Sequence, residues 1–283
     1  MPEVGITVGA LLGEARARLR AAGVDDPARE AAWLWEGVTR APSGAAYLAR
    51  EREADADEAA RFAGAVERRA GGEPLAYVIG WTAFRRRTVA TDRRALIPRP
   101  ETEGLVELVL ARRPTGRVAD VCTGTGCVAL ALADEGRYDE VYAVELDPAA
   151  HALAAENIAA AGLPVRLLAG DLVAPLRGLR LDVVVANPPY VSEPEYAALD
   201  PAVAAWEPRA ALASGASGLD HTRRLLDEAR EVLAPGGLIA LELDATRGAA
   251  SAALAATYGW TDIAVHHDLY GRDRFLTARR GEE

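Results

Sequence analysis

Apolar residues over the first 70 positions recur at helical spacing. Leu11, Ala15 and Leu19 follow one another at intervals of four residues, as on one face of a helix. A second apolar group spans residues 31–35 and follows Asp26-Pro27, a pair typical of a helix start. A third group lies within residues 55–69. The pattern predicts a small helical bundle over residues 7–70.

The helical pattern ends at Gly71-Gly72-Glu73-Pro74, because glycine and proline both disfavour a helix interior. Residues 75–100 have the composition of short extended segments and turns. We therefore predict three parts. They are an N-terminal helical domain (1–72), an extended or hairpin linker (73–100) and an α/β domain (101–283).

From residue 101 onward, apolar runs typical of strands alternate with helical patterns. Acidic residues in the first turn of a helix after Pro100 suit the helix dipole. Further helices are predicted at 125–134, 148–161 and 220–233. This alternation predicts a doubly wound α/β sheet of seven strands whose last pair is antiparallel. The predicted strands are residues 118–122, 141–144, 165–168, 183–186, 238–243, 263–265 and 274–278.

The strand at 183–186 leads directly into Asn187-Pro188-Pro189-Tyr190. Two prolines in succession cannot continue a sheet, so the strand has to end there. In an open α/β sheet the carboxyl ends of the strands are where ligands bind. An amide side chain, unpaired carbonyls and an aromatic ring at that edge are able to hold a planar NH2 group. The alternative is a strand that merely ends in two prolines.

Three earlier strand ends carry groups suited to a nucleoside ligand. The segment from Asp120 to Gly126 joins a strand to a helix and contains Gly-x-Gly. It lacks the third glycine of a dinucleotide site and the Lys of a phosphate-binding loop. Glu145 is placed to accept hydrogen bonds from ribose hydroxyls, and Asp171 to face an adenine amino group. The predicted cofactor-binding residues are Asp120, Cys122, Thr123, Gly124, Thr125, Gly126, Glu145, Asp171, Leu172 and Asn187.

Charge is distributed unevenly along the 283 residues. Residues 1–90 hold 13 Arg and 13 acidic residues, whereas residues 91–283 hold 19 Arg and 29 acidic residues. The net charge of −10 therefore lies in the part that carries the motifs. An acidic domain gains nothing from counterion release, which disfavours nucleic acid as the primary partner.

Cys122 and Cys127 are the only cysteines, and neither has a neighbouring His. This argues against a zinc site and favours free thiols, so we predict no metal. No signal peptide and no apolar run of membrane-spanning length are evident. We therefore expect a cytoplasmic protein without a membrane partner.

Several stretches that cover almost the whole chain form a recognisable series. They are Arg68-Arg69, 73–80, 96–103 (containing RPETE), 123–126, 187–190, 207–212, 218–220 and 268–274. In this order they resemble class I S-adenosylmethionine-dependent methyltransferases. More narrowly they resemble the HemK/PrmC family, the protein-(glutamine-N5) methyltransferases that act on peptide chain release factors.

The resemblance implies methyl transfer from S-adenosylmethionine to the glutamine amide nitrogen in the Gly-Gly-Gln loop of release factors 1 and 2. It makes Asn187, Pro188 and Tyr190 the catalytic residues, and adds Pro189 to the substrate contacts. The helical domain would dock the release factor, and we expect a monomer. The chain departs from the family at Cys122, where glycine is usual, and at Glu145, where aspartate is common. It departs again at Asp244 and Arg247, where the family tends to have Gly and Gln.

Two other functions remain open from the sequence. Asn-Pro-Pro-Tyr is similar to motifs of enzymes that methylate exocyclic amino groups of nucleic-acid bases. The departures from the family pattern also permit a non-catalytic binding protein that has lost its cofactor. Cofactor titration separates the binding protein from the enzymes, and nucleic-acid binding in moderate salt separates the two enzymes.

Overall fold

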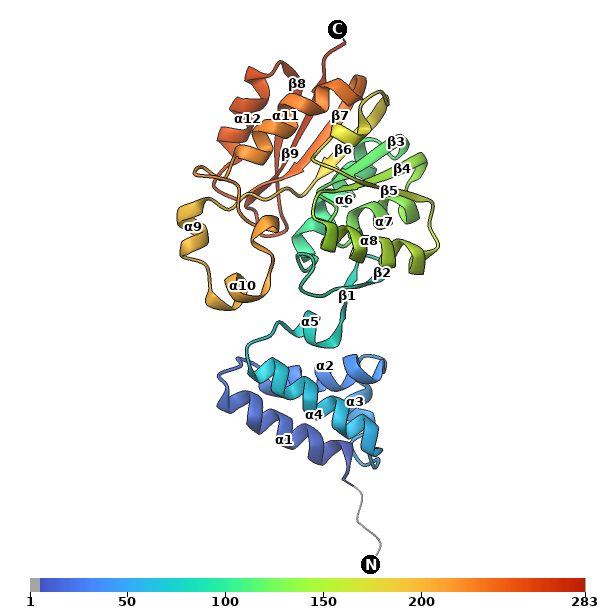
Figure 1. Cartoon of the computed structure of the whole chain (residues 1–283), viewed down its shortest axis with the longest axis vertical. Coiled ribbons are helices and arrows are strands. Elements are labelled where there is room, and N and C mark those ends of the chain that lie inside the picture. Colours follow the sequence, from blue (N-terminus) through green and yellow to red (C-terminus); the bar gives the residue numbers. More distant parts are fainter. Residues whose placement is uncertain (1–5, 283) are drawn as a thin grey trace, which may run out of the picture. The chain divides into compact units, whose positions relative to one another are not determined.

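The computed structural model describes residues 6–282 (Figure 1). Its contacts divide the chain into two units: the first ends at Trp81 and the second begins at Thr82. The division into residues 1–72, 73–100 and 101–283 stays a prediction.

The first unit is a bundle of short helices with side-chain caps at their amino ends. Thr7, Asp26 and Asp55 each accept a hydrogen bond from a backbone N–H in the first turn of the following helix, which satisfies donors that the helix cannot pair. Phe62 is fully buried in the shared apolar core. The predicted helical bundle is confirmed, with α1 Val8–Ala21, α2 Pro27–Thr39, α3 Ala45–Leu48, α4 Ala56–Ala70 and α5 Leu75–Ile79.

Helix α5 departs from the sequence prediction, which made residues 75–79 extended. Its composition, Leu-Ala-Tyr-Val-Ile, is typical of a strand. The flanking residues decide otherwise, because Pro74 precedes the first turn and Gly80 ends the helix at a φ of 82°. Tyr77 and Val78 are buried, so packing overrides their strand preference. The extended prediction was wrong for these five residues.

The second unit is built on a seven-stranded sheet with the order β5-β4-β3-β6-β7-β9-β8 (Figure 1). Neighbours from β5 to β7 are parallel, and β9 runs antiparallel to both β7 and β8. The predicted doubly wound sheet with an antiparallel last pair is therefore confirmed. The strands are β3 Thr115–Val121, β4 Arg137–Glu145, β5 Val165–Ala169, β6 Leu181–Ala186, β7 Leu233–Glu242, β8 Trp260–His267 and β9 Asp273–Arg280.

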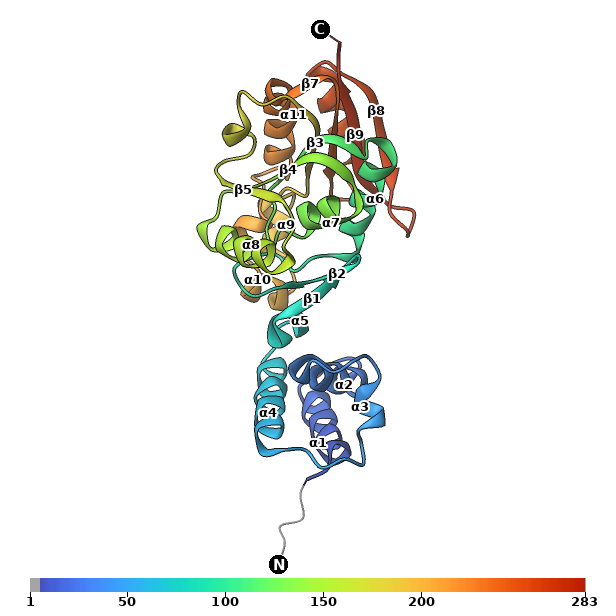
Figure 2. The same cartoon turned by 90° about the vertical axis from the view of Figure 1, so that its right-hand side faces the viewer.

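Alternate residues of the central strands enter two separate cores, and helices cover both faces of the sheet (Figure 2). One face packs against α11 Asp220–Val232 and α12 Gly248–Thr257. The other packs against α6 Pro100–Arg112, α7 Cys127–Glu135 and α8 Pro148–Ala161. A hairpin of β1 Trp81–Phe84 and β2 Arg87–Ala90 precedes α6.

The sequence pattern missed several elements. Helix α12 consists mostly of Ala, so it shows no apolar stripe. The short helices α9 Glu193–Ala197 and α10 Pro201–Trp206 were also missed, although Ser192 and Glu195 form a capping box that marks the start of α9. Strand β7 begins before Pro235-Gly236-Gly237, because an irregularity in its pairing with β6 accommodates that turn. No helix within residues 6–282 has the length and apolar content of a membrane span.

We predict that Phe62→Ala destabilises the helical unit by about 3–5 kcal/mol, because it leaves a cavity in the core. Phe62 is 1% exposed, whereas Leu48 of the same unit is 84% exposed. Leu48→Ala is the matched control and should cost less than about 0.5 kcal/mol. Hydrogen exchange at α1, α2 and α4 measures both effects. Equal protection in the two variants would contradict the described core.

Candidate active site

The carboxyl ends of β3, β4 and β6 surround a cavity of about 320 Å³ in the second unit. The strand order reverses direction between β3 and β6, which is where open α/β sheets bind ligands. Most of the predicted site residues line this cavity. They are Asp120, Cys122, Thr123, Gly124, Thr125, Glu145, Asp171, Leu172, Asn187 and Pro189, whereas Gly126, Pro188 and Tyr190 are not among its lining residues.

The side chain of Asp120 holds the loop between β3 and α7 through two hydrogen bonds. One carboxylate oxygen, Oδ2, accepts from the Thr123 hydroxyl at 2.5 Å and from the Ala129 backbone N–H at 3.1 Å. Asp120 is 1% exposed, and burial raises its pKa to about 7 against the opposing effect of these hydrogen bonds. Asp120 therefore supports the loop that faces the cavity.

Cys122 has a backbone conformation that suits glycine better than cysteine. Its φ is 61°, in the left-handed region that residues with a Cβ avoid. Its side chain packs against the apolar core on one face of the sheet. Burial raises the pKa of the Cys122 thiol and, to about 12, that of the Cys127 thiol, so both stay protonated. Within residues 6–282 no group of side chains is suited to hold a metal ion.

Glu145 presents an ordered carboxylate at the end of β4. Its Oε1 accepts from the backbone N–H groups of Leu146 and Asp147 at 2.9 and 3.0 Å, and its Oε2 accepts from Gly124 at 2.8 Å. Each carboxylate oxygen has two lone pairs, so capacity remains at Oε2 for a ligand hydroxyl. Glutamate thus joins two loops of the cavity in the place where the family commonly has aspartate.

Asp171 lies on the rim of the cavity and is already engaged in an ion pair. Arg224 of α11 lies 2.8 Å from its carboxylate, and both side chains are almost half exposed. An exposed ion pair of this kind is weak, so a ligand amino group is able to compete for Asp171. Leu172, next in the chain, is buried and contributes an apolar wall.

The segment Asn187–Tyr190 lies at the end of β6. Asn187 donates from Nδ2 to the Thr102 hydroxyl at 3.2 Å, while Pro188 and Pro189 are buried. Tyr190 is half-buried; burial, and then the nearby Glu242 carboxylate, raise the pKa of its phenol. A protonated phenol is no general base at neutral pH. A Cβ at Gly218 would lie 2.5 Å from the Tyr190 carbonyl oxygen, so the following loop packs closely against this segment.

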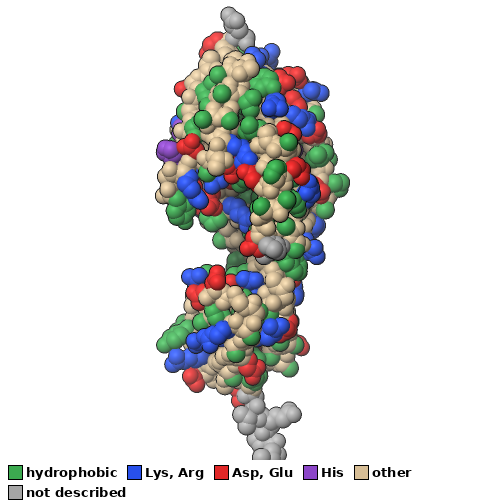
Figure 3. All heavy atoms as spheres, turned by 90° about the vertical axis from the view of Figure 1, so that its left-hand side faces the viewer, with side chains coloured by type: hydrophobic (Ala, Val, Ile, Leu, Met, Phe, Trp, Pro, Cys, Tyr) green, Lys and Arg blue, Asp and Glu red, His purple; other side chains and the backbone are tan. Residues whose placement is uncertain are grey.

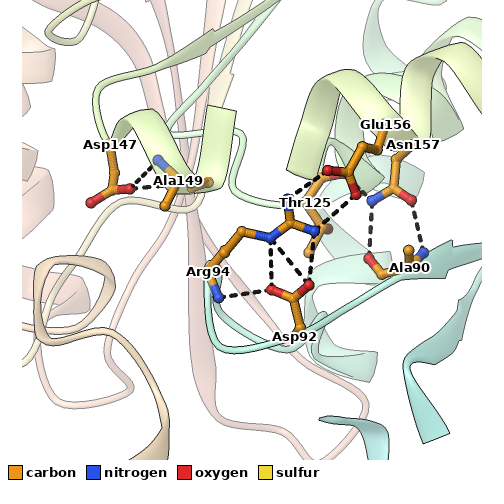
Figure 4. A network of polar contacts seen from close by, with 9 residues as sticks. Ala90, Asp92, Arg94, Thr125, Asp147, Ala149, Glu156 and Asn157 are labelled. Carbon is orange, nitrogen blue, oxygen red and sulfur yellow. Dashed lines mark hydrogen bonds and ion pairs between the residues drawn. The ribbon is translucent and has the colours of Figure 1, made fainter. Parts of the chain in front are cut away.

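Residues to which the sequence assigned no role hold two segments that line the cavity. Arg99 pairs with the buried Glu207 at 2.5 Å, which joins the RPETE stretch to residues 207–212. Asn157 of α8 is 5% exposed; it exchanges two hydrogen bonds with Ala90 and donates to the Thr125 carbonyl at 2.9 Å (Figure 4). Asn157 shares the buried face of α8 with Leu153 and Ala154. A polar residue on an apolar helix face was the signal available in the sequence.

Asp244 and Arg247, which follow β7, form an ion pair with each other. Arg247 pairs with Asp244 at 2.9 Å and with Glu195 of α9 at 2.5 Å, and it donates to the Ser217 carbonyl at 2.9 Å. These contacts join α9, the loop at residue 217 and the start of α12. The replaced residues therefore form a structural connection beside the site.

Known proteins are similar to both parts of this chain. A family model described as PrmC N-terminal domain matches residues 10–80, and one described as methyltransferase small domain matches residues 101–204. The release factor glutamine methyltransferase of Cereibacter sphaeroides is 40% identical over 264 residues, covering 93% of this chain and 94% of the relative. That of Moorella thermoacetica is 43% identical over 286 residues, covering 98% and 100%. The chain belongs to the release factor glutamine methyltransferase family.

A solved methyltransferase from Pyrococcus furiosus has a similar fold. Its TM-score is 0.52 at 19% identity, and the match covers 68% of this chain and 88% of that one. At this identity the similarity concerns the fold alone, and it agrees with the sheet described above.

The methyl donor of this enzyme is S-adenosylmethionine. The residues present fit that molecule, because the cavity has the size of a small-molecule site. Its loop has backbone positions at Gly124 and Gly126 with φ of 56° and 83°, which allow a ligand to approach the main chain closely. Glu145 offers an acceptor and Leu172 an apolar surface in the same cavity.

We predict that Asn157→Leu destabilises the second unit by about 1–3 kcal/mol and weakens cofactor binding. The change leaves the Ala90 and Thr125 backbone groups without their partner. Glu156→Gln, on the same helix, is the control, because the Glu156 side chain is 57% exposed and its ion pair with Arg94 (Figure 4) is screened by water, so the change should cost less than about 1 kcal/mol. Urea denaturation and cofactor titration measure both effects. An Asn157→Leu variant as stable as the control would contradict the described support.

We also predict a pH-dependent gain of stability in Asp120→Asn. The pKa of Asp120 rises from 3.8 to about 7 on folding, so its contribution is fully present below pH 3.8 and is lost as the pH rises through 7. Asparagine does not ionise, and its single oxygen is able to accept both hydrogen bonds. The difference in Tm between variant and wild type should therefore move in favour of the variant from about pH 5 to pH 8. A constant difference would refute a buried carboxyl with a raised pKa.

Proposed function

We propose that this enzyme transfers a methyl group from S-adenosylmethionine to the side-chain N5 atom of the glutamine in the Gly-Gly-Gln motif of peptide chain release factors 1 and 2. The names of relatives at 40% and 43% identity support a release factor as substrate. The observation that carries the proposal is the placement of Asn187. It lines the cavity, and its Nδ2 is already engaged by Thr102.

A glutamine amide nitrogen is a weak nucleophile, because its lone pair is delocalised into the carbonyl. Bound S-adenosylmethionine supplies an electrophilic methyl group on a sulfonium, which needs no metal or covalent intermediate. The protein then has to aim the nitrogen at that methyl group and bind the two amide hydrogens. Positioning and electrostatics of this kind account for large rate enhancements.

The Asn187 Oδ1 and the Pro188 carbonyl are the acceptors that we assign to the amide hydrogens. Tyr190 would pack against the amide plane and Pro189 would complete the pocket. Hydrogen-bond acceptors on the two N–H groups increase the electron density at nitrogen as the N–C bond forms and the S–C bond breaks. The proton released from the nitrogen passes to water, and S-adenosylhomocysteine is the second product.

The cofactor assignments follow the same geometry. The loop from Cys122 to Gly126 would hold the methionine part, above the Asp120 carboxyl that supports it. Glu145 would accept the ribose hydroxyls, and Asp171 and Leu172 would contact the adenine. The ordered Glu145 carboxylate and the weak pairing of Asp171 support these two assignments.

We infer that the helical unit docks the release factor. Its exposed apolar side chains include Trp33, Tyr47 and Leu48. The guanidinium groups of Arg29 and Arg50 lie 4.7 Å from the Trp33 and Tyr47 rings. Apolar and cationic groups side by side suit a polypeptide surface. On the face drawn in Figure 3, positive and negative side chains are interspersed, which is unlike the continuous basic surface of a nucleic-acid enzyme.

We predict that Asn187→Ala lowers kcat by at least about 10²- to 10³-fold, because one of the two acceptors is lost. Cofactor affinity should be largely retained. The assay is peptide mass spectrometry of unmodified release factor after incubation with S-adenosylmethionine, beside cofactor titration by calorimetry. Asp244→Asn is a control outside the cavity wall, and it should remain active.

Three results would overturn this account. Full activity of Asn187→Ala would remove the catalytic assignment. Cofactor binding without methylation of the Gly-Gly-Gln glutamine would move the substrate to another protein or to a nucleic-acid base. Absence of cofactor binding would favour a binding protein that has lost its enzymatic function.

A further inference from the structure

Three polar residues from three elements converge at the cavity wall: Asn187 and Thr102 line the cavity, and Glu242 lies behind them. The pairing of Ala186 with Leu241 places the next residues, Asn187 and Glu242, beside each other at the ends of β6 and β7. Both then point toward the face of the sheet that α6 covers, since side chains alternate along a strand. Thr102, in the first turn of α6, accepts a hydrogen bond from Asn187 Nδ2 at 3.2 Å, and its hydroxyl is near enough to Glu242 to lower the pKa of that carboxyl.

Thr102 and Glu242 are both inside the protein, at 3% and 1% exposure. Burial raises the pKa of Glu242 to about 7, whereas the Thr102 hydrogen bond and the cations Arg274 and Arg99 lower it; Glu101 raises it. The Oε2 atom of Glu242 has no hydrogen-bond partner among the described residues. Because few donors surround this buried carboxylate, a hydrogen bond from the Thr102 hydroxyl would stabilise its ionised form.

The chemistry of the Thr102 hydroxyl decides which neighbour it donates to and which it accepts from. A threonine hydroxyl has one proton and two lone pairs, and an ionised carboxylate only accepts. Thr102 already accepts from the Asn187 NH2, which leaves its own proton to be donated toward Glu242, whose Oε2 has no hydrogen-bond partner among the described residues. An amide next to an acceptor has to turn its NH2 toward it. Asn187 Oδ1 is thereby turned away from Thr102.

We propose that Thr102 and Glu242 are positioning residues that fix the side-chain amide of Asn187, so that its oxygen rather than its nitrogen is presented to the substrate. This proposal rests on the function proposed above and extends it to substrate selection. A fixed oxygen acceptor accommodates the NH2 of glutamine and repels the carboxylate of glutamate. Sites that recognise a group by hydrogen bonding discriminate strongly against analogues that lack it.

The test compares Thr102→Val, which removes the hydroxyl at nearly constant volume, with Thr102→Ser, which keeps it. We expect Thr102→Val to lower kcat about tenfold or more, the effect of a lost hydrogen bond at a reacting group, with cofactor affinity unchanged. Thr102→Ser should restore kcat. Inhibition by a release factor with glutamate in place of the target glutamine should increase in Thr102→Val and not in Thr102→Ser.

A second readout needs no turnover. In ¹⁵N spectra the side-chain NH2 of Asn187 should be protected from exchange in the wild type and in Thr102→Ser, and unprotected in Thr102→Val. Absence of wild-type methylation would contradict the proposed function, and these spectra would still decide the positioning role. Wild-type kcat in Thr102→Val, equal protection in all three proteins, or a parallel loss of cofactor affinity would each overturn the proposal.

Discussion

The end of β6 is the constraint on which the rest of the site depends. Because Pro188 and Pro189 cannot extend the sheet, Asn187 stays at its carboxyl edge. The parallel pairing of β6 with β3 and β7 then aligns this edge with the loop after β3 and with Glu242. Tertiary contacts turn that alignment into a cavity, since Asn157 and the Arg99–Glu207 pair hold its walls. The backbone at the end of β6 thus determines where the side chains of the site lie.

Several residues around that edge have conformations or burial that are unfavourable for stability. Asp120 and Glu242 are carboxyl groups whose pKa burial raises to about 7, and Cys122 has a φ of 61°. Each departs from what favours stability alone. Asp120 and Cys122 lie in or under the loop that lines the cavity, and Glu242 lies beside Asn187. The Asp244–Arg247 pair shows the opposite: two departures from the family pattern that compensate each other through one ion pair.

The sequence predicts most of the fold and much of the cavity wall, for definite reasons. Strands buried on both faces give continuous apolar runs, and Pro or Gly marks their ends, so β3 to β7 and their loops were found. The pattern failed where alanine hides the apolar face, as in α12, and where caps outweigh strand propensity, as in α5. Thr102, Asn157 and Glu207 received no role, because their importance comes from partners 85, 67 and 108 residues away. Such pairings depend on packing, which sequence spacing does not reveal.

The central claim is that a glutamine amide is held by acceptors at the end of β6. A crystal structure of the enzyme with S-adenosylhomocysteine and a peptide containing Gly-Gly-Gln tests it most directly. Our account predicts the glutamine Nε2 at about 2.7–3.2 Å from both Asn187 Oδ1 and the Pro188 carbonyl, with Asn187 Nδ2 still bound to Thr102. A glutamine bound elsewhere, or facing an Asn187 amide that has turned away from Thr102, would contradict it.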